Sequence, residues 1–383
     1  MRFSRCAPLL SFRRPPARAG PQLFTPFKVG KLDLANRIVI APMCQYSAVD
    51  GCMTDWHLIH LGHLALSGAA LMMLEVAAVT PEGRITHGDV GLYDDASEAA
   101  IARTLESVAP LVGHADRHPA VARADARRRA RCPEGGGQIA PGADKGWQTE
   151  ALPAGFLPVD TPPTALDREG LARLRDAFAA AATRAARLGI DAIQLHAAHG
   201  YLLHQFLSPL ANHRDDDHGG SLENRMRFPL EVYDAVRAAF PADRPVTMRV
   251  SGTDWSRVAG TANRPSPSPR RSRPAGAMLI HVSSGALSPD QQIPVGPSYQ
   301  VPLARQVKQA VGIPVVAVGL ITDYEQAEAI IDTGDADLVA LARTLLYDPR
   351  WPWHAAAHLG GHVKAPNQYL RSQPRQCKDL FQA

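Results

Sequence analysis

Seven short apolar runs recur along the chain, and most of them are separated by stretches with helical periodicity. The runs are nearly continuous rather than alternating, which is typical of parallel strands buried on both faces. They span residues 37–43, 71–79, 190–198, 246–251, 277–284, 314–319 and 338–343. Strand–helix alternation over roughly 330 residues predicts an α/β fold, a TIM (β/α)8 barrel. A doubly wound open sheet is the alternative, but "APMCQYSAVDG" after the first run is not the Gly-rich turn that such a sheet requires.

The helical stretches carry recognisable start and stop signals. One runs from about Ser97, a good N-cap, to Ala109, and a long one ends at Gly189. Another helix lies within 222–240, where Ser221 can act as the cap. Pro229 is expected to limit the first part of this helix.

Two segments break the alternation where a barrel requires an element. Residues 112–133 are rich in arginine and lack a buried apolar run, so we expect a disrupted third strand. Residues 256–276 contain four prolines, which predicts a disrupted fifth helix. Both segments have the Arg, Pro, Ala and Ser content of GC-rich codons read in a shifted frame. Natural, disordered basic insertions fit this composition equally well, and both interpretations stay open.

Composition and charge exclude several classes of protein. Hydrophobic residues make up 45% of the chain, and the net charge of +4 gives no indication of nucleic-acid binding. No apolar run reaches the ~18 residues of a membrane span. Five cysteines without C-x-x-C spacing disfavour an iron–sulfur cluster and fit a reducing, cytoplasmic location. Residues 1–21 are basic and proline-rich and are predicted to form a disordered extension.

Polar residues follow the predicted strands at their carboxyl ends, where a barrel enzyme has its active site. His196 and His199 end one run, Tyr201 follows two residues later, and Arg249 lies within the next run. Two histidines at this spacing are also compatible with core packing or with zinc, but a third ligand is missing nearby. The strand ends lack a carboxylate cluster, which argues against an oxygen-ligated metal. We therefore predict no metal site.

The ends of the last two runs predict an anion site. Gly319 follows "PVVAV" and Arg343 follows "LVALA". In a barrel this position binds phosphate through backbone N–H groups and an arginine. A phosphorylated cofactor would fit such a site.

Five longer motifs resemble the Old Yellow Enzyme family of FMN-dependent ene-reductases, above all its thermophilic-like bacterial branch. They are "LFTPFKVGKLDLANRIVIAPMCQYSA", "HAAHGYLLHQFLSPLANHRDDDHGGSLENRMRF", "MRVSGTDW", "IHVSSG" and "NQYLRSQP". The similarity covers about 23–111, 134–255 and 277–380. It implies an FMN-binding barrel over 22–360 and a C-terminal tail over 361–383.

The resemblance also implies the reaction and the catalytic roles. In this family NADPH or NADH reduces FMN, and the flavin passes hydride to the β-carbon of an α,β-unsaturated carbonyl compound, the small-molecule enone substrate. His196 and His199 would bind the carbonyl oxygen and stabilise the charge that develops on it. Tyr201 would deliver the proton to the α-carbon, since a phenol with a reference pKa of about 10 stays protonated at neutral pH.

Further contacts with cofactor and substrate follow from the same resemblance. Arg249 would lie against the N1–O2 edge of the flavin and raise its reduction potential, and Cys44 would tune that potential. The other residues expected to bind FMN are Ala41, Pro42, Met43, Val76, Gly319, Ala342 and Arg343. Tyr46 would line the substrate pocket. Arg371 resembles an arginine that this branch lends to a neighbouring site, so we expect a homo-oligomer, either a dimer or a tetramer.

Several alternatives stay open at this point. Arg249 could instead pair with an acid such as Asp254, and Cys44 could be an ordinary core residue. A dienoyl-CoA reductase relative would need a cysteine cluster after the eighth strand, where Cys377 stands alone. A tRNA dihydrouridine synthase would need a basic helical C-terminal domain. The last alternative is a catalytically impaired flavin-binding barrel from a frame-disrupted gene.

One departure from the family pattern lies at the third strand. The family has a Gln there that contacts the flavin pyrimidine, followed by His-Ala-Gly-Arg-Lys, and 112–133 contains neither. The segments "GGGQIAP" and "KGWQ" that normally follow are intact. A missing strand leaves buried ladder groups unpaired, at ~1–3 kcal/mol each. We therefore predict that the chain folds poorly or binds FMN weakly.

Overall fold

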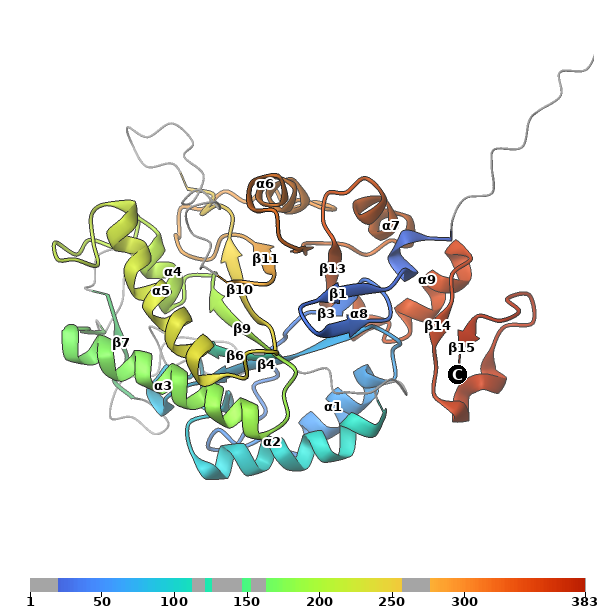
Figure 1. Cartoon of the computed structure of the whole chain (residues 1–383), viewed down its shortest axis with the longest axis horizontal. Coiled ribbons are helices and arrows are strands. Elements are labelled where there is room, and N and C mark those ends of the chain that lie inside the picture. Colours follow the sequence, from blue (N-terminus) through green and yellow to red (C-terminus); the bar gives the residue numbers. More distant parts are fainter. Residues whose placement is uncertain (1–19, 112–120, 126–146, 153–162, 257–275, 383) are drawn as a thin grey trace, which may run out of the picture.

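The computed structural model contains a closed barrel of eight parallel strands (Figure 1). It describes residues 20–111, 121–125, 147–152, 163–256 and 276–382. The β3–β4 pairing closes the ring, and every other pair of neighbours is also parallel. In order around the barrel the strands are β3 (Ile38–Ile40), β4 (Leu71–Ala78), β6 (Val121–Asp125), β9 (Ala192–Ala197), β10 (Val246–Ser251), β11 (Ile280–Ser283), β12 (Val315–Ala317) and β13 (Leu338–Leu341). All seven apolar runs are strands, so the predicted barrel is confirmed.

The expected disruption of the third strand is not found. β6 occupies the third position and pairs with β4 on one side and β9 on the other. Its register against β4 shifts between Met73 and Val76, which marks a bulge or irregularity. Ladder bonds join main-chain groups, so a strand can form there without the apolar side chains on which the prediction was based. The expected disruption of the fifth helix falls on 257–275, outside the described residues.

Helices surround the barrel and connect successive strands (Figure 1). They are α1 (Asp55–Ala65), α2 (Asp95–Val108), α3 (Arg168–Arg187), α4 (Leu202–Leu207), α5 (Leu222–Ala239), α6 (Val301–Val311), α7 (Tyr324–Asp332), α8 (Arg343–Tyr347) and α9 (Trp351–Leu359). The outward-facing side chains of the strands pack against them in one large apolar cluster. No helix in the described ranges is both long and apolar enough to cross a membrane.

Two helix boundaries differ from those expected. Asp94, not Ser97, caps α2, because the Asp94 carboxylate accepts the Ser97 amide at 2.8 Å and the helix begins three residues earlier than predicted. α5 continues through Pro229, which is buried inside it. The predicted cap of α5 is confirmed, since Ser221 Oγ accepts the Asn224 amide at 3.2 Å.

Short elements complete the fold. β1 (Phe27–Val29) and β2 (Leu32–Leu34) form an antiparallel hairpin, and β5 (Val90–Gly91) extends β4. The short parallel pairs are β7 (Glu150–Ala151) with β8 (Thr164–Ala165) and β14 (Val363–Lys364) with β15 (Phe381–Gln382). The 3-10 turns are η1 (Gln22–Phe24), η2 (Pro81–Gly83), η3 (Ala109–Leu111) and η4 (Asn367–Ser372).

The inside of the barrel changes from apolar to polar along the strands. A second apolar cluster includes Val39, Leu71 and Leu338 from the strands together with Val29 and Leu34 of the hairpin. Further along the strands the buried side chains become polar and include Gln194, His196, Arg249, His281 and Ser283. The interior therefore collects its hydrogen-bonding groups at the end where barrel enzymes bind their substrates.

Candidate functional site

Three side chains from the end of β9 and the start of α4 converge at the carboxyl end of the barrel. The imidazole of His196 lies 5.0 Å from that of His199 and 4.8 Å from the phenol ring of Tyr201, measured between ring centroids. His196 is fully buried and Tyr201 is buried. The structure thus brings together the three residues that the sequence predicts to be catalytic.

The turn that carries these groups has an uncommon backbone. His199 and Gly200 have φ angles of +59° and +75°, both in the left-handed region. A residue with a side chain occupies this region at a cost of roughly 1–2 kcal/mol. Glycine is required at the second position, because an added Cβ would lie 2.5 Å from the carbonyl oxygen of Ala286. Such a turn persists only where neighbouring groups hold it.

A polar network joins the turn to the neighbouring strands. His199 Nε2 and Ser283 Oγ are 2.6 Å apart, and Arg249 Nη2 donates to the same hydroxyl oxygen at 3.4 Å. Gln300 Oε1 accepts from Ser283 at 3.3 Å and from Ser284 at 2.6 Å. The guanidinium of Arg249 is therefore buried inside the barrel and linked to His199 through one hydroxyl group.

Asp254, which the sequence offered as a partner for Arg249, is engaged by other groups. Its carboxylate lies 2.9 Å from His204 Nε2 and accepts a hydrogen bond from Ser208 Oγ at 2.7 Å. The contacts of Asp254 are therefore with His204 on α4 and with Ser208, which follows that helix.

Three members of this network, Ser283, Ser284 and Gln300, are not among the residues that the sequence predicts for the site. The sequence could have indicated Ser283 as a site residue, since it lies at the carboxyl end of a predicted strand. Nothing in the sequence indicated Gln300, because it lies outside every motif and reaches the site only through the position of α6. Its role depends on tertiary structure that no local pattern encodes.

The loop after β3 packs beside Tyr201. Val76, Ile85 and Tyr201 form a small buried cluster against which Cys44 packs. Tyr46 lies two residues further on, with a left-handed φ of +53° and 37% of its surface exposed. Cys44 and Val76, both expected to contact FMN, are therefore neighbours of the predicted proton donor.

Glu75 is a buried carboxylate within β4 whose contacts support the same loop. Its Oε1 lies 3.1 Å from His57 Nε2, and its Oε2 accepts the amide of Gln45 at 3.1 Å. The other ring nitrogen of His57 accepts the Thr54 amide at 3.0 Å. The acid thus braces the backbone next to Cys44.

The residues predicted to bind phosphate lie at the ends of adjacent strands. β12 leads to Gly319 and β13 to Ala342 and Arg343, and the two strands are paired. β13 also pairs with β3, where the Ala41 amide donates to the carbonyl oxygen of Leu341 at 2.9 Å. Arg343 is exposed, while Ala41, Pro42 and the half-buried Met43 lie at the end of β3.

Arg371 lies in a separate part of the molecule. It belongs to η4, which packs with β14 and β15 on α9 through a small apolar cluster that includes Trp353, Val363 and Leu380. The arginine is exposed. Within one chain, Arg371 is not joined to His196 or Tyr201 by any contact that the described residues make.

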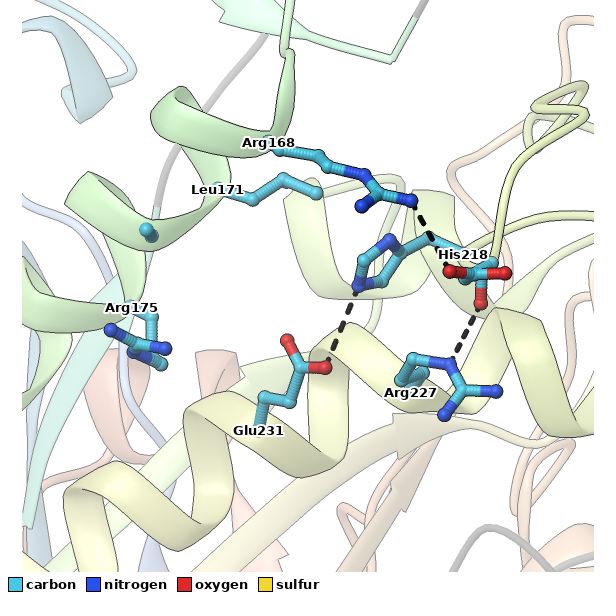
Figure 2. A pocket seen from close by; sticks show the side chains of 8 residues that line it. Arg168, Leu171, Arg175, His218, Arg227 and Glu231 are labelled. Atoms are coloured by element: carbon cyan, nitrogen blue, oxygen red, sulfur yellow. Dashed lines mark hydrogen bonds and ion pairs between the residues drawn. The ribbon is translucent and has the colours of Figure 1, made fainter.

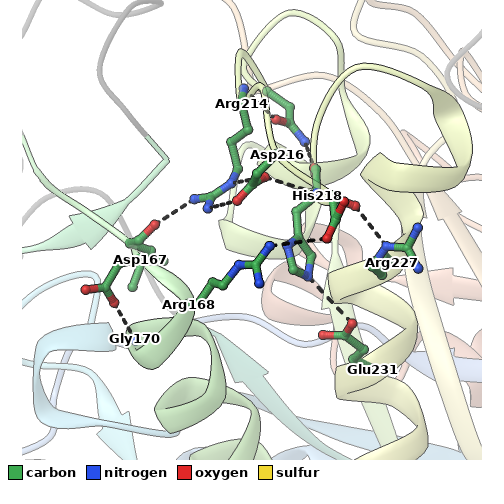
Figure 3. A network of polar contacts seen from close by, with 11 residues as sticks. Asp167, Arg168, Gly170, Arg214, Asp216, His218, Arg227 and Glu231 are labelled. Carbon is green, nitrogen blue, oxygen red and sulfur yellow. Dashed lines mark hydrogen bonds and ion pairs between the residues drawn. The ribbon is translucent and has the colours of Figure 1, made fainter.

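The long loop between α4 and α5 is held from outside the barrel. Arg214 binds the Asp216 carboxylate through Nε at 2.9 Å and Nη2 at 2.5 Å, and its Nη1 donates to the carbonyl oxygen of Leu166 at 2.6 Å (Figure 3). Nearby, α3 and α5 flank a hollow of about 480 Å³ in which His218 faces Glu231 at 3.6 Å (Figure 2). These contacts fix the loop on the outside of the barrel.

The charges at the carboxyl end of the barrel suit FMN. A buried guanidinium at Arg249 matches the carbonyl oxygens of a pyrimidine, and the exposed Arg343 beside Gly319 matches a phosphate. Glu75 is buried near this edge and is already held by His57 and Gln45, and the buried Asp254 is held by His204 and Ser208. Among the described residues, no group of His, Cys, Asp or Glu side chains is arranged to hold a metal ion.

Comparison with known proteins assigns the family. Residues 22–361 match the NADH:flavin oxidoreductase / NADH oxidase family. The chain is 40% identical to an NADPH dehydrogenase of Geobacillus thermodenitrificans over 91% of its length and 98% of the relative. It is 39% identical to an NADH:flavin oxidoreductase of Gibberella zeae, over 91% of this chain and 88% of that one.

Solved structures agree with the sequence comparison. Morphinone reductase has a TM-score of 0.70 at 26% identity, covering 92% of this chain and 93% of that one. An old yellow enzyme homologue of Zymomonas mobilis shares the fold, with a TM-score of 0.70 at 23% identity over 95% of this chain and all of the other. The chain belongs to the NADH:flavin oxidoreductase / NADH oxidase family and is an FMN-dependent oxidoreductase of the old yellow enzyme type that uses NADH or NADPH.

Proposed function

We propose that this oxidoreductase reduces the activated C=C bond of α,β-unsaturated carbonyl compounds. The observation that carries the proposal is the convergence of two imidazoles and a phenol, with His196 5.0 Å from His199 and 4.8 Å from Tyr201 between ring centroids. An enone requires hydrogen-bond donors at its carbonyl oxygen and an acid at its α-carbon, and these three side chains supply both.

FMN, when bound, supplies the hydride that it has taken from the nicotinamide. Arg249 would hold the pyrimidine of the cofactor, and Gly319, Ala342 and Arg343 would hold its phosphate. Ala41, Pro42, Met43, Cys44 and Val76 complete the cofactor site. Residues 22–360 together form this FMN-binding barrel, with 1–21 and 361–383 as flanking segments.

The side chains of this protein carry out the proton and charge transfers. His196 and His199 donate hydrogen bonds to the carbonyl oxygen, so that negative charge moves onto this oxygen as hydride adds to the β-carbon. Tyr201 then gives its phenolic proton to the α-carbon and regains a proton from solvent. The alkene thereby gains one hydride and one proton, which balances the oxidation of the nicotinamide.

Substrate positioning involves Tyr46 and Arg371. Tyr46 is partly exposed and lies two residues after Cys44, which packs against Tyr201, and this supports its assignment to the lining of the substrate pocket. Arg371 is exposed on η4, away from its own barrel mouth, and we assign it to the site of a second copy in a dimer or tetramer. An Arg371→Ala variant would then raise the KM for the enone, and sedimentation velocity would show an oligomer.

Anaerobic mixing tests the proposed reaction. With FMN in excess, NADPH should bleach the flavin absorption, and 2-cyclohexenone or N-ethylmaleimide should then restore it. Bleaching without restoration by either alkene would rule out enone reduction while leaving the NADPH oxidoreductase intact. Failure to bleach would indicate the catalytically impaired barrel instead.

A further inference from the structure

A buried histidine behind the catalytic turn contacts the turn directly. His204, on α4, accepts the amide N–H of Gly200 at its Nδ1, over 2.9 Å. Gly200 separates His199 from Tyr201, so this single bond lies between the carbonyl-binding group and the proton donor. The side chain of His204 is only 3% exposed, which keeps water from replacing it as the acceptor.

A carboxylate from the next strand fixes the orientation of this ring. Asp254 Oδ1 lies 2.9 Å from His204 Nε2, and Ser208 Oγ donates to Oδ2 at 2.7 Å. Since Nδ1 accepts from Gly200, the ring proton resides on Nε2 and is donated to Asp254. Burial raises the pKa of Asp254, but His204 and Ser208 lower it further than burial raises it, so the group stays a carboxylate.

The Tyr201 amide donates to the carbonyl oxygen of Ala198 at 3.2 Å, and two other polar groups of the turn are held by side chains. Ser251 Oγ accepts the His199 amide at 3.2 Å, and Gln205 Nε2 donates to the Gly200 carbonyl oxygen at 2.8 Å. The two consecutive left-handed residues, His199 and Gly200, have no regular backbone ladder to keep them in place. The turn therefore depends on these contacts for its shape, and His204 supplies the one at the central amide.

We propose that His204, oriented by Asp254, is a positioning residue that holds the His199–Gly200–Tyr201 turn and so sets the distance between the carbonyl-binding imidazole and the proton-donating phenol. This inference rests on the proposed enone reduction. His204 acts through the backbone, because its bond is to the Gly200 amide, and its loss affects protonation of the substrate more than binding of the cofactor.

Two substitutions separate the two bonds of His204. In His204→Asn, the amide oxygen replaces Nδ1 and keeps the Gly200 bond. In His204→Gln, the longer side chain replaces Nε2 and keeps the Asp254 bond while the Gly200 bond is lost. We expect enone-dependent reoxidation to slow about 10- to 100-fold in His204→Gln, as for a small misplacement of a catalytic group, and to change less than about 3-fold in His204→Asn. His218→Gln, which removes a partly buried histidine that also faces a carboxylate, is the control.

Separate measurements of kcat, KM and FMN binding distinguish a positioning role of His204 from a general loss of structure. In His204→Gln, kcat should fall with little change in the KM of the enone, while reduction by NADPH and the Kd of FMN stay within about 2-fold of wild type. The same substitution in a Tyr201→Phe background should have a much smaller effect, because residues that act as one unit are not additive.

Hydrogen exchange of the FMN-free chain tests the inference without any reaction. The peptide containing Gly200 and Tyr201 should exchange faster in His204→Gln than in wild type or His204→Asn. Equal exchange and equal reoxidation rates in the Gln and Asn variants would overturn the positioning role. If wild type itself fails to reduce enones, the proposed function falls, and the exchange rates alone decide the role of His204.

Discussion

The rings of His196 and Tyr201 lie 4.8 Å apart between centroids, although one residue ends a strand and the other precedes a helix. The left-handed turn at His199 and Gly200 makes this approach possible, because it folds the chain back after β9. An imidazole and a phenol at this separation can form hydrogen bonds to neighbouring atoms of one small substrate.

Replacing Tyr201 by Phe tests the proton donor. The ring and its packing against Val76 and Ile85 remain, while the acidic hydroxyl is lost. We expect reoxidation by 2-cyclohexenone to slow by about 10²- to 10⁴-fold, the usual contribution of a general acid. Stopped-flow absorbance should show an unchanged rate of reduction by NADPH, and an equal loss in both half-reactions would contradict the assignment.

Replacing Arg249 by Met tests the role of the buried cation. Arg249 is 6% exposed and contacts Ser283, so a residue of similar length that lacks the charge keeps most of the packing. We expect a more negative flavin reduction potential and at least about 10-fold weaker FMN binding, since a charge-assisted interaction of about 1.5–3 kcal/mol is lost. Potentiometric titration and flavin fluorescence measure the two quantities. An unchanged potential would place Arg249 outside the flavin contact.

FMN affinity tests the consequence of the unusual third strand. β6 pairs with both neighbours, so the ladder does not have the gap that the sequence suggested. The glutamine that the family places on this strand is still missing from 112–133. We predict that FMN dissociates during gel filtration in flavin-free buffer, and a fully loaded, monodisperse sample after this step would refute weak binding.

Acid unfolding tests the brace formed by Arg214 and Asp216. The hydrogen bonds from Arg214 hold the pKa of Asp216 well below its ordinary value, despite an opposing effect of burial. A depressed folded-state pKa adds stability above the ordinary pKa and loses it as the pH falls towards the folded-state value. Because Asp216 is partly exposed, its share is about 1 kcal/mol or less.

The matched substitution is Asp216→Asn. Urea unfolding between about pH 5 and pH 2 should show a shallower loss of stability for this variant than for wild type. The exposed pair Arg168–Asp217 provides the control, and Asp217→Asn should leave the slope unchanged. Identical slopes for Asp216→Asn and wild type would show that the pair does not stabilise the fold.

Periodicity predicted the barrel, and strand-end position placed His196, His199 and Tyr201 at its carboxyl end, while their joint role came from the family resemblance. Those features are local, because buried parallel strands are apolar throughout and their carboxyl ends share one edge. The third strand escaped prediction, since backbone pairing does not require apolar side chains. Gln300 and the His204–Asp254 pair were missed as well, because their contacts depend on how α6 and the loop after β10 fold onto the site.

The fate of isotopic label in the product tests the central claim most directly. The chain, saturated with FMN, is given 2-methylcyclohexenone and unlabelled NADPH in heavy water, and the product is analysed by NMR. We predict 2-methylcyclohexanone with deuterium at the α-carbon and hydrogen at the β-carbon, and loss of this product in Tyr201→Phe. No saturated ketone, or the same rate of α-deuteration in Tyr201→Phe, would contradict the account.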